Sequence, residues 1–135
     1  MGRSLLILLD THVVIWLAQD YQRISPKAHA AIQNARSKER GVAVSCITLV
    51  EIALLASRKR IDLSPDAETV LAEVESHFIV LPITRNVALQ AFELPEMYPN
   101  DPVDRIIGAT ALIEDIPLLT ADRNIRKSRA VPTIW

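Results

Sequence analysis

The fold is decided by the stretch Leu5-Leu6-Ile7-Leu8-Leu9-Asp10-Thr11-His12 near the start of the chain. Its five apolar residues do not alternate with polar ones, which is typical of a strand buried on both faces, as in parallel sheets. Asp10 and Thr11 then suit the beginning of a helix, because their side chains can cap its first free N–H groups. The stretch therefore predicts a buried strand that leads straight into a helix.

The same alternation of strands and helices continues along the 135 residues, and several of the eight prolines mark its boundaries. We expect strands at residues 5–9, 42–45, 79–82, 118–120 and 131–134. We expect helices at residues 12–19, 26–36, 48–58, 65–77 (opened by Ser64-Pro65, with Glu68 completing the cap), 84–92, 102–114 and 124–128. This order predicts a single α/β domain over residues 1–135, with a mainly parallel sheet of four or five strands flanked by helices.

The composition excludes several classes of protein. Half of the residues are hydrophobic and 23% are charged, which excludes a disordered chain. The single cysteine cannot form an internal disulfide, and no glycine-rich phosphate loop occurs. The first apolar run is too short for a signal peptide or a membrane span, so we expect a cytoplasmic protein with no membrane association.

Four carboxylates follow predicted strands or lie in the first turns of predicted helices: Asp10, Glu51, Asp104 and Asp122. In open parallel sheets, ligands bind outside the carboxyl ends of the strands, so these side chains are expected to converge there. Each of the aspartates also has an ordinary explanation. Asp10 suits a helix cap, Asp104 suits the first turn of a helix, and Asp122 suits a turn.

Glu51 is harder to explain in this way. It is the only charged residue between Ile47 and Ala56, in a helix that is apolar nearly all round and is therefore expected to be buried. A buried carboxylate without a partner is costly and tends to take up a proton. Glu51 therefore needs a cation, a proton or a water-filled cleft.

The four carboxylates together indicate a metal site. At separations of about 6 Å and an effective dielectric constant of about 20, each pair repels by about 3 kcal/mol, and six pairs by on the order of 16 kcal/mol. That repulsion rivals the stability of a whole domain, so a cluster of this kind requires a cation. Oxygen ligands favour Mg²⁺ or Mn²⁺, which can convert water into hydroxide and neutralise charge on a phosphate.

Four segments of the chain, in order, resemble the motifs of the PIN-domain ribonucleases, and within them the VapC-like toxins of bacterial toxin–antitoxin pairs. The first two segments are Leu8-Leu9-Asp10-Thr11-His12 and residues 44–53, around Glu51. The last two are Asp101-Pro102-Val103-Asp104-Arg105 and Leu119-Thr120-Ala121-Asp122. The subgroup often has an aromatic residue where this chain has Leu49-Val50 and Val103, which concerns packing rather than the acidic residues.

The resemblance implies a PIN-like three-layer fold and an endoribonuclease that depends on Mg²⁺ or Mn²⁺. Carried over by position, Asp10, Glu51, Asp104 and Asp122 become the catalytic and metal-binding acids, and hydrolysis leaves a 5′-phosphate and a 3′-hydroxyl. Thr11 and Thr120 would support them through their hydroxyls, and Asp101 is an additional acid whose part stays open. For two further residues the alternatives are a functional role or an ordinary structural one: Arg105 orients a carboxylate, meets phosphate or forms a surface ion pair, and His12 is a ligand or a partly buried histidine.

The resemblance also implies the partners: an RNA substrate, a cognate antitoxin that blocks the site, and a second copy of the chain in a homodimer. Fifteen basic residues balance sixteen acidic ones, and setting the four site acids aside leaves 15 against 12, a mildly basic remainder. Arg123, Arg126, Lys127 and Arg129, which follow the fourth motif, could contact RNA phosphates or form a solvated face. Six aromatic residues are too few for base stacking to be the main grip on RNA.

Two alternative functions stay open from the sequence. A receiver-like signalling domain also places aspartates at strand ends, but here no Asp ends the strand at residues 79–82 and no Lys follows Thr120. The other alternative is a catalytically silent PIN scaffold that binds a partner, against which the complete set of four acids argues.

Overall fold

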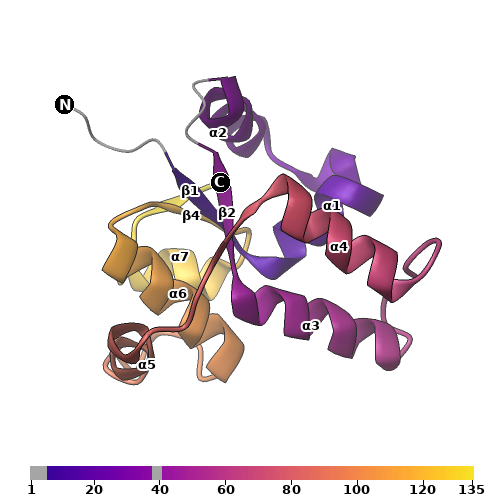
Figure 1. Cartoon of the computed structure of the whole chain (residues 1–135). Helices are drawn as coiled ribbons and strands as arrows, with labels where there is room; N and C mark the ends of the chain where they lie inside the picture. Colours follow the sequence, from indigo (N-terminus) through magenta and orange to yellow (C-terminus); the bar gives the residue numbers. More distant parts are fainter. Residues whose placement is uncertain (1–5, 38–40) are drawn as a thin grey trace.

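A five-stranded sheet in the order β3-β2-β1-β4-β5 forms the centre of the protein in a computed structural model, which describes residues 6–37 and 41–135 (Figure 1). All four strand pairs are parallel. The strands are β1 (Ile7–Leu9), β2 (Val42–Ser45), β3 (Ile79–Leu81), β4 (Leu118–Leu119) and β5 (Thr133–Ile134). The predicted α/β class with a parallel sheet is confirmed, while the first predicted strand residue, Leu5, lies outside the described residues.

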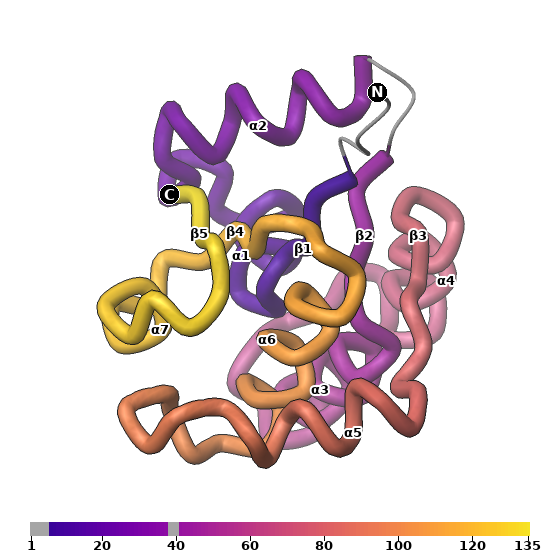
Figure 2. Tube along the Cα trace, turned by 90° about the vertical axis from the view of Figure 1, so that its left-hand side faces the viewer, coloured from indigo at the N-terminus to yellow at the C-terminus, as the bar shows by residue number. Residues whose placement is uncertain are grey.

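The helices connect the strands and lie on both faces of the sheet (Figure 2). They are α1 (Thr11–Gln19), the short 3-10 helix η1 (Tyr21–Arg23), α2 (Pro26–Ser37), α3 (Cys46–Ser57), α4 (Ala67–His77), α5 (Arg85–Ala91), α6 (Pro102–Glu114) and α7 (Arg123–Ser128). Every predicted helix therefore exists, with boundaries that differ by at most two residues.

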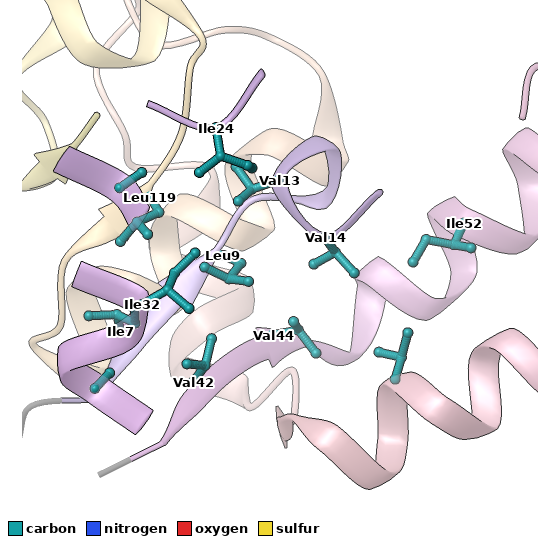
Figure 3. Packing of buried hydrophobic residues seen from close by; sticks show 13 residues of the cluster. Ile7, Leu9, Val13, Val14, Ile24, Ile32, Val42, Val44, Ile52 and Leu119 are labelled. Atoms are coloured by element: carbon teal, nitrogen blue, oxygen red, sulfur yellow. The ribbon is translucent and has the colours of Figure 1, made fainter. Parts of the chain in front are cut away.

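Alternate residues of the strands point to opposite faces, and each face has its own hydrophobic core. Ile7, Leu9 and Leu119 pack with α1, α2 and parts of α3 and α4 (Figure 3). Leu8 and Leu118 pack on the other side with Tyr98 and with residues of α6 and α7. Helices cover both faces of the sheet, which explains why the apolar strand residues do not alternate with polar ones. The predicted three-layer arrangement is therefore confirmed.

Two helices begin two residues away from the position that the sequence suggested. The fourth helix begins at Ala67 rather than at Pro65, because the Asp66 carboxylate accepts a hydrogen bond from the Thr69 N–H at 2.8 Å and makes Asp66 the N-cap. Glu68 therefore does not complete the cap at Ser64. The third helix begins at Cys46 rather than Thr48, because the Ser45 hydroxyl accepts from the Ile47 N–H.

Helix α3 is less buried than its apolar composition suggested. Val50 is 59% exposed and Leu54 is 43% exposed, whereas Ile52 is buried. The expectation of an all-round buried helix is therefore wrong, because α3 packs on α1, α4 and α6 and leaves one apolar side open. Glu51 is half-buried at the edge of that open side.

None of the helices within the described ranges is long and apolar enough to cross a membrane.

Candidate active site

The register of the sheet places Asp10 beside Thr120. Leu9 lies opposite Leu119, so the next residue of each strand emerges at the same carboxyl edge of the sheet. The Asp10 N–H donates to the Leu119 carbonyl, and the Thr120 hydroxyl donates to Asp10 Oδ2 at 2.7 Å. Asp10 also caps α1 by accepting from the Thr11 N–H, so its carboxylate is buried and held at both oxygens.

Asp122 and His12 complete this side of the site. The Asp122 N–H donates to the Thr120 hydroxyl at 3.1 Å, and Asp122 Oδ1 caps α7 by accepting from the N–H groups of residues 124 and 125. His12 Nε2 accepts from the Ala121 N–H at 3.0 Å, which leaves the proton of the neutral ring on Nδ1, 3.6 Å from Asp10 Oδ2. His12 thus joins the first motif to the fourth.

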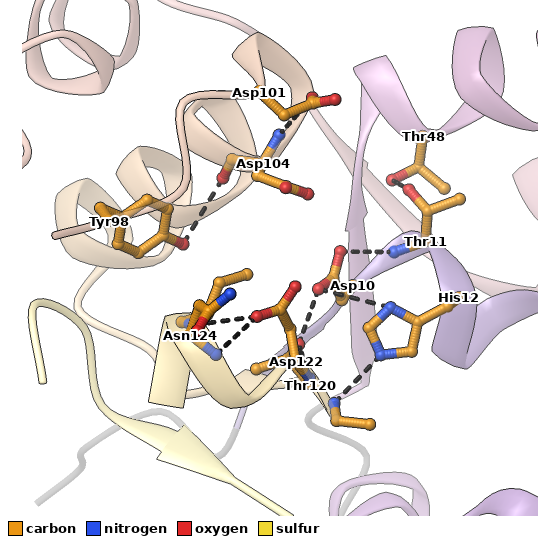
Figure 4. A network of polar contacts seen from close by, with 12 residues as sticks. Asp10, Thr11, His12, Thr48, Tyr98, Asp101, Asp104, Thr120, Asp122 and Asn124 are labelled. Atoms are coloured by element: carbon orange, nitrogen blue, oxygen red, sulfur yellow. Dashed lines mark hydrogen bonds and ion pairs between the residues drawn. The ribbon is translucent and has the colours of Figure 1, made fainter. Parts of the chain in front are cut away.

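Helix α6 brings Asp101 and Asp104 to the opposite side. Asp101 is its N-cap and accepts from the N–H groups of Val103 and Asp104 at 2.8 and 3.3 Å. Asp104, in the first turn, points into the same space as Asp10 and Asp122, which come from two other elements (Figure 4). These aspartates therefore do serve as helix caps or first-turn acids, and they also converge on one space.

Glu51 approaches from α3. A single pocket is lined by Asp10, Glu51 and Asp104 together with His12 and Thr11, and by the apolar Ile15 and Leu55. The Thr11 hydroxyl lies 3.1 Å from the Thr48 hydroxyl, and a hydrogen bond from Thr11 to Glu51 favours the ionised carboxylate. The first three motifs thus meet around this pocket, with Asp122 beside it.

The carboxylates of this pocket strongly influence one another. Burial, and then the negative charges of Asp10, Asp101, Glu51 and Asp122, raise the pKa of Asp104 to about 7. Burial also raises the pKa of Glu51, an effect that the Asp10 charge strengthens. Since no cationic side chain of the described residues lowers the pKa of Asp104, the pocket concentrates negative charge that a bound cation would neutralise.

The chemistry of these side chains fits a small divalent cation. All are hard oxygen donors, the class that Mg²⁺ and Mn²⁺ prefer. Within the described ranges, no three acidic, histidine or cysteine side chains stand close enough together to hold a metal ion by themselves. Mg²⁺ is commonly bound by one or two carboxylates with water in the remaining positions, so Asp10 and Asp104 suffice as direct ligands.

Arg105 has a structural role that differs from each sequence-based interpretation. Its side chain is buried and donates four hydrogen bonds of 3.1 to 3.2 Å to backbone carbonyls, those of residues 91, 94, 95 and 98. It therefore neither orients a carboxylate nor forms a surface ion pair, because backbone carbonyls occupy its buried guanidinium. Arg105 instead fixes the loop between α5 and α6, which leads to Asp101.

Tyr98 and Gly108 are two residues of this region that the sequence did not single out. Tyr98 is buried, and its hydroxyl donates to the Asp104 backbone carbonyl at 3.5 Å. A Cβ atom at position 108 would overlap that hydroxyl, so only glycine lets the ring pack against α6. A glycine inside an apolar helix was the available signal, because it marks a close approach.

Comparisons with known proteins agree with this architecture. The family model of the PIN domain matches residues 7–130. Ribonuclease VapC22 from Mycobacterium tuberculosis (strain ATCC 25618 / H37Rv) is 37% identical over 131 residues, which cover 96% of this chain and 98% of that protein.

Solved structures show the same fold at low sequence identity. VapBC2 from Rickettsia felis, bound to a promoter DNA fragment, matches with a TM-score of 0.71 and 14% identity over 95% of this chain and 96% of that chain. VapBC-1 from nontypeable Haemophilus influenzae matches with a TM-score of 0.69 and 17% identity over the same shares. The family match, the full-length similarity and the fold lead to one conclusion: the chain belongs to the PIN domain family.

Proposed function

We propose that this protein is a divalent-metal-dependent endoribonuclease that acts as the toxin of a toxin–antitoxin pair. The observation that carries the proposal is the convergence of Asp10, Glu51 and Asp104 on one pocket, where burial, and then the repulsion between the carboxylates, raise the pKa of Asp104 to about 7. Such a pocket is unfavourable without a cation and suits one well. The 37% identity to a protein named as a ribonuclease supports the same activity.

Each acid has a distinct part in this proposal. Asp10 and Asp104 hold Mg²⁺ or Mn²⁺, and Asp122 does so directly or through water. The bound ion supplies Lewis-acid chemistry, which activates water and neutralises charge on the scissile phosphate. Glu51, the acid nearest the open side of α3, binds the ion or orients the attacking water. Thr120 and His12 keep the Asp10 carboxylate in place.

The surface beside Asp122 supports RNA binding. Helix α7 begins directly after Asp122, and its basic side chains Arg123, Arg126 and Lys127 are exposed, as is Arg129 that follows. These charges attract phosphates that flank the acidic pocket, in the way that basic rims generally bind nucleic-acid backbones. The nearly equal numbers of acidic and basic residues therefore conceal an uneven distribution, with an acidic pocket and a basic rim beside it.

A cognate antitoxin and a second copy of the chain are the expected protein partners. Structural neighbours are toxin–antitoxin complexes, one of them from Klebsiella pneumoniae. Exposed apolar residues provide surface for both partners, including Val50 and Leu54 on α3 and Leu89 and Phe92 on or beside α5. We expect the protein to act in the cytoplasm, where its RNA substrate is found.

RNA cleavage assays with Mg²⁺, with Mn²⁺ and with EDTA test the activity. We expect cleavage with the metals, none with EDTA, and a loss of at least a hundredfold in Asp10→Asn and Asp104→Asn. Glu114→Gln is the matched control, because Glu114 is an exposed acid at the other end of α6. Full activity of folded Asp104→Asn with Mn²⁺ would contradict the proposal.

A silent scaffold is the second candidate, and one observation favours it: the described acids do not form a ready-made cage of three ligands. The two candidates predict different thermal unfolding in the presence of Mn²⁺. A ligand at a hundred times its dissociation constant stabilises the folded state by about 2.7 kcal/mol. No rise in melting temperature with Mn²⁺ would favour the scaffold.

A further inference from the structure

Both tryptophans of the chain lie together beside the acidic pocket, with a histidine between them and the carboxylates. The His12 ring lies 4.8 Å from the Trp16 ring and 6.5 Å from the Trp135 ring, and the two tryptophan rings are 5.9 Å apart, all measured between centroids. The Arg23 guanidinium lies over Trp16, 4.1 Å from its ring centre. We call His12, Trp16, Trp135 and Arg23 the aromatic cluster.

The topology explains why the aromatic cluster adjoins the site. Ile134 pairs with Leu119 in the parallel sheet, and its carbonyl accepts from the Thr120 N–H at 3.4 Å. Trp135 therefore emerges at the same carboxyl edge of the sheet as Asp10. His12 belongs to the aromatic cluster and also lines the acidic pocket, so the two features share a wall.

The aromatic cluster has the chemistry of a stacking surface. All three rings are partly exposed, and the Arg23 side chain is 57% exposed, with Asp20 at 4.0 Å. Single-stranded nucleic acids place bases on aromatic rings and on arginine guanidinium planes, which suit every base because each has a π-face. An exposed guanidinium also favours an anionic strand over a purely apolar ligand.

We infer that the aromatic cluster stacks one nucleobase of the RNA strand beside the phosphate held at the acidic pocket. The inference rests on the proposed function for its substrate class, and it adds a position that contributes to sequence preference. It involves one base, so phosphate contacts supply most of the grip, in keeping with only six aromatic residues in the chain.

Intrinsic fluorescence offers a direct test, because Trp16 and Trp135 are the only tryptophans in the sequence and both belong to the aromatic cluster. The full chain with Asp104→Asn, which we expect not to cleave, is titrated with a 5′-fluorescein-labelled single-stranded RNA in Mg²⁺. Anisotropy of the label reports binding. In a separate titration with the unlabelled strand, quenching of the tryptophan emission reports stacking. We expect tryptophan emission to fall by a third or more, and abasic substitution at one nucleotide position to remove that fall.

Variants separate stacking from a merely structural role. Trp135→Ala is expected to weaken RNA binding about tenfold and to relax the preference at one nucleotide position of the cleaved RNA. Trp135→Phe keeps a ring and is expected to restore most of both. Tyr21→Ala, which removes an exposed aromatic ring that packs on His29 outside the aromatic cluster, is the control and should leave the cleavage pattern unchanged.

The outcomes distinguish this inference from the proposed function. RNA binding by anisotropy without any change in tryptophan emission, or an unchanged cleavage pattern in Trp135→Ala, would overturn the stacking inference and leave the ribonuclease intact. Absence of both RNA binding and metal-dependent cleavage by the unsubstituted chain would overturn both.

Discussion

Replacing Asp104 with asparagine is expected to stabilise the metal-free protein in alkaline solution while removing its activity. The pKa of this carboxyl rises from 3.8 to about 7 on folding, chiefly through burial and then through the charges of Asp10 and other acids. Once ionised, such a group costs the folded state up to about 4 kcal/mol, at about 1.4 kcal/mol per tenfold change in acid dissociation. Because the pocket is open to solvent, screening reduces this, and we expect about 2 kcal/mol.

The sign of the effect depends on pH. Between pH 4 and 7 the folded protein holds a proton on Asp104 that the unfolded chain has lost, so the stability due to this group falls as pH rises. Asp104→Asn lacks this fall in stability, because asparagine does not titrate. Its advantage over the unsubstituted protein should therefore be small near pH 4 and reach its full size above pH 7.

Urea unfolding in EDTA at pH 4.5, 6, 7 and 8.5 measures this difference, with Glu114→Gln as the control for a lost surface charge. Addition of Mg²⁺ at pH 8.5 should then stabilise the unsubstituted protein more than Asp104→Asn, because the ion takes over the neutralisation of the carboxylate. Equal or lower stability of Asp104→Asn than of the unsubstituted protein at pH 8.5 without metal would contradict this prediction.

Three other predictions each concern one residue. Arg105→Met removes four hydrogen bonds to backbone carbonyls, and calorimetry should show that the free energy of unfolding falls by about 3 kcal/mol or more. A fall of less than about 1 kcal/mol would contradict the role of Arg105 in fixing the loop between α5 and α6. Thr120→Val removes the hydroxyl that donates to Asp10 Oδ2, and should lower the rate of RNA cleavage ten- to a hundredfold while the melting temperature changes little. Burial lowers the pKa of His12 from 6.5, so protonation of the unfolded chain lowers stability as pH falls below 6.5; His12→Gln should lack this part of the pH dependence in urea unfolding.

Local sequence signals predicted the sheet edge and its acids well. The apolar run before Asp10 required a covered strand, and the Asp101-Pro102 pair marked the beginning of α6 correctly. Parallel connections then bring residues after different strands to one edge, which is why Asp10 and Thr120 meet there, and the first turn of α6 adds Asp104, 94 positions after Asp10.

Contacts between distant segments could not be predicted in the same way. Arg105 sits within a motif, yet its partners are carbonyls of a loop whose path depends on the packing of α5 on α6. The acceptor role of His12 depends on the Ala121 N–H, 109 residues away. The open side of α3 was missed because its composition alone does not show which face the neighbouring helices leave uncovered.

Calorimetric titration with Mn²⁺ at pH 8 tests most directly the central claim that the acids of the first and third motifs hold a divalent ion. We predict saturable binding by the unsubstituted protein, binding weakened at least tenfold in Asp10→Asn and in Asp104→Asn, and unchanged binding in Glu114→Gln. Equal Mn²⁺ affinity in all four proteins, or no binding to any of them, would contradict it.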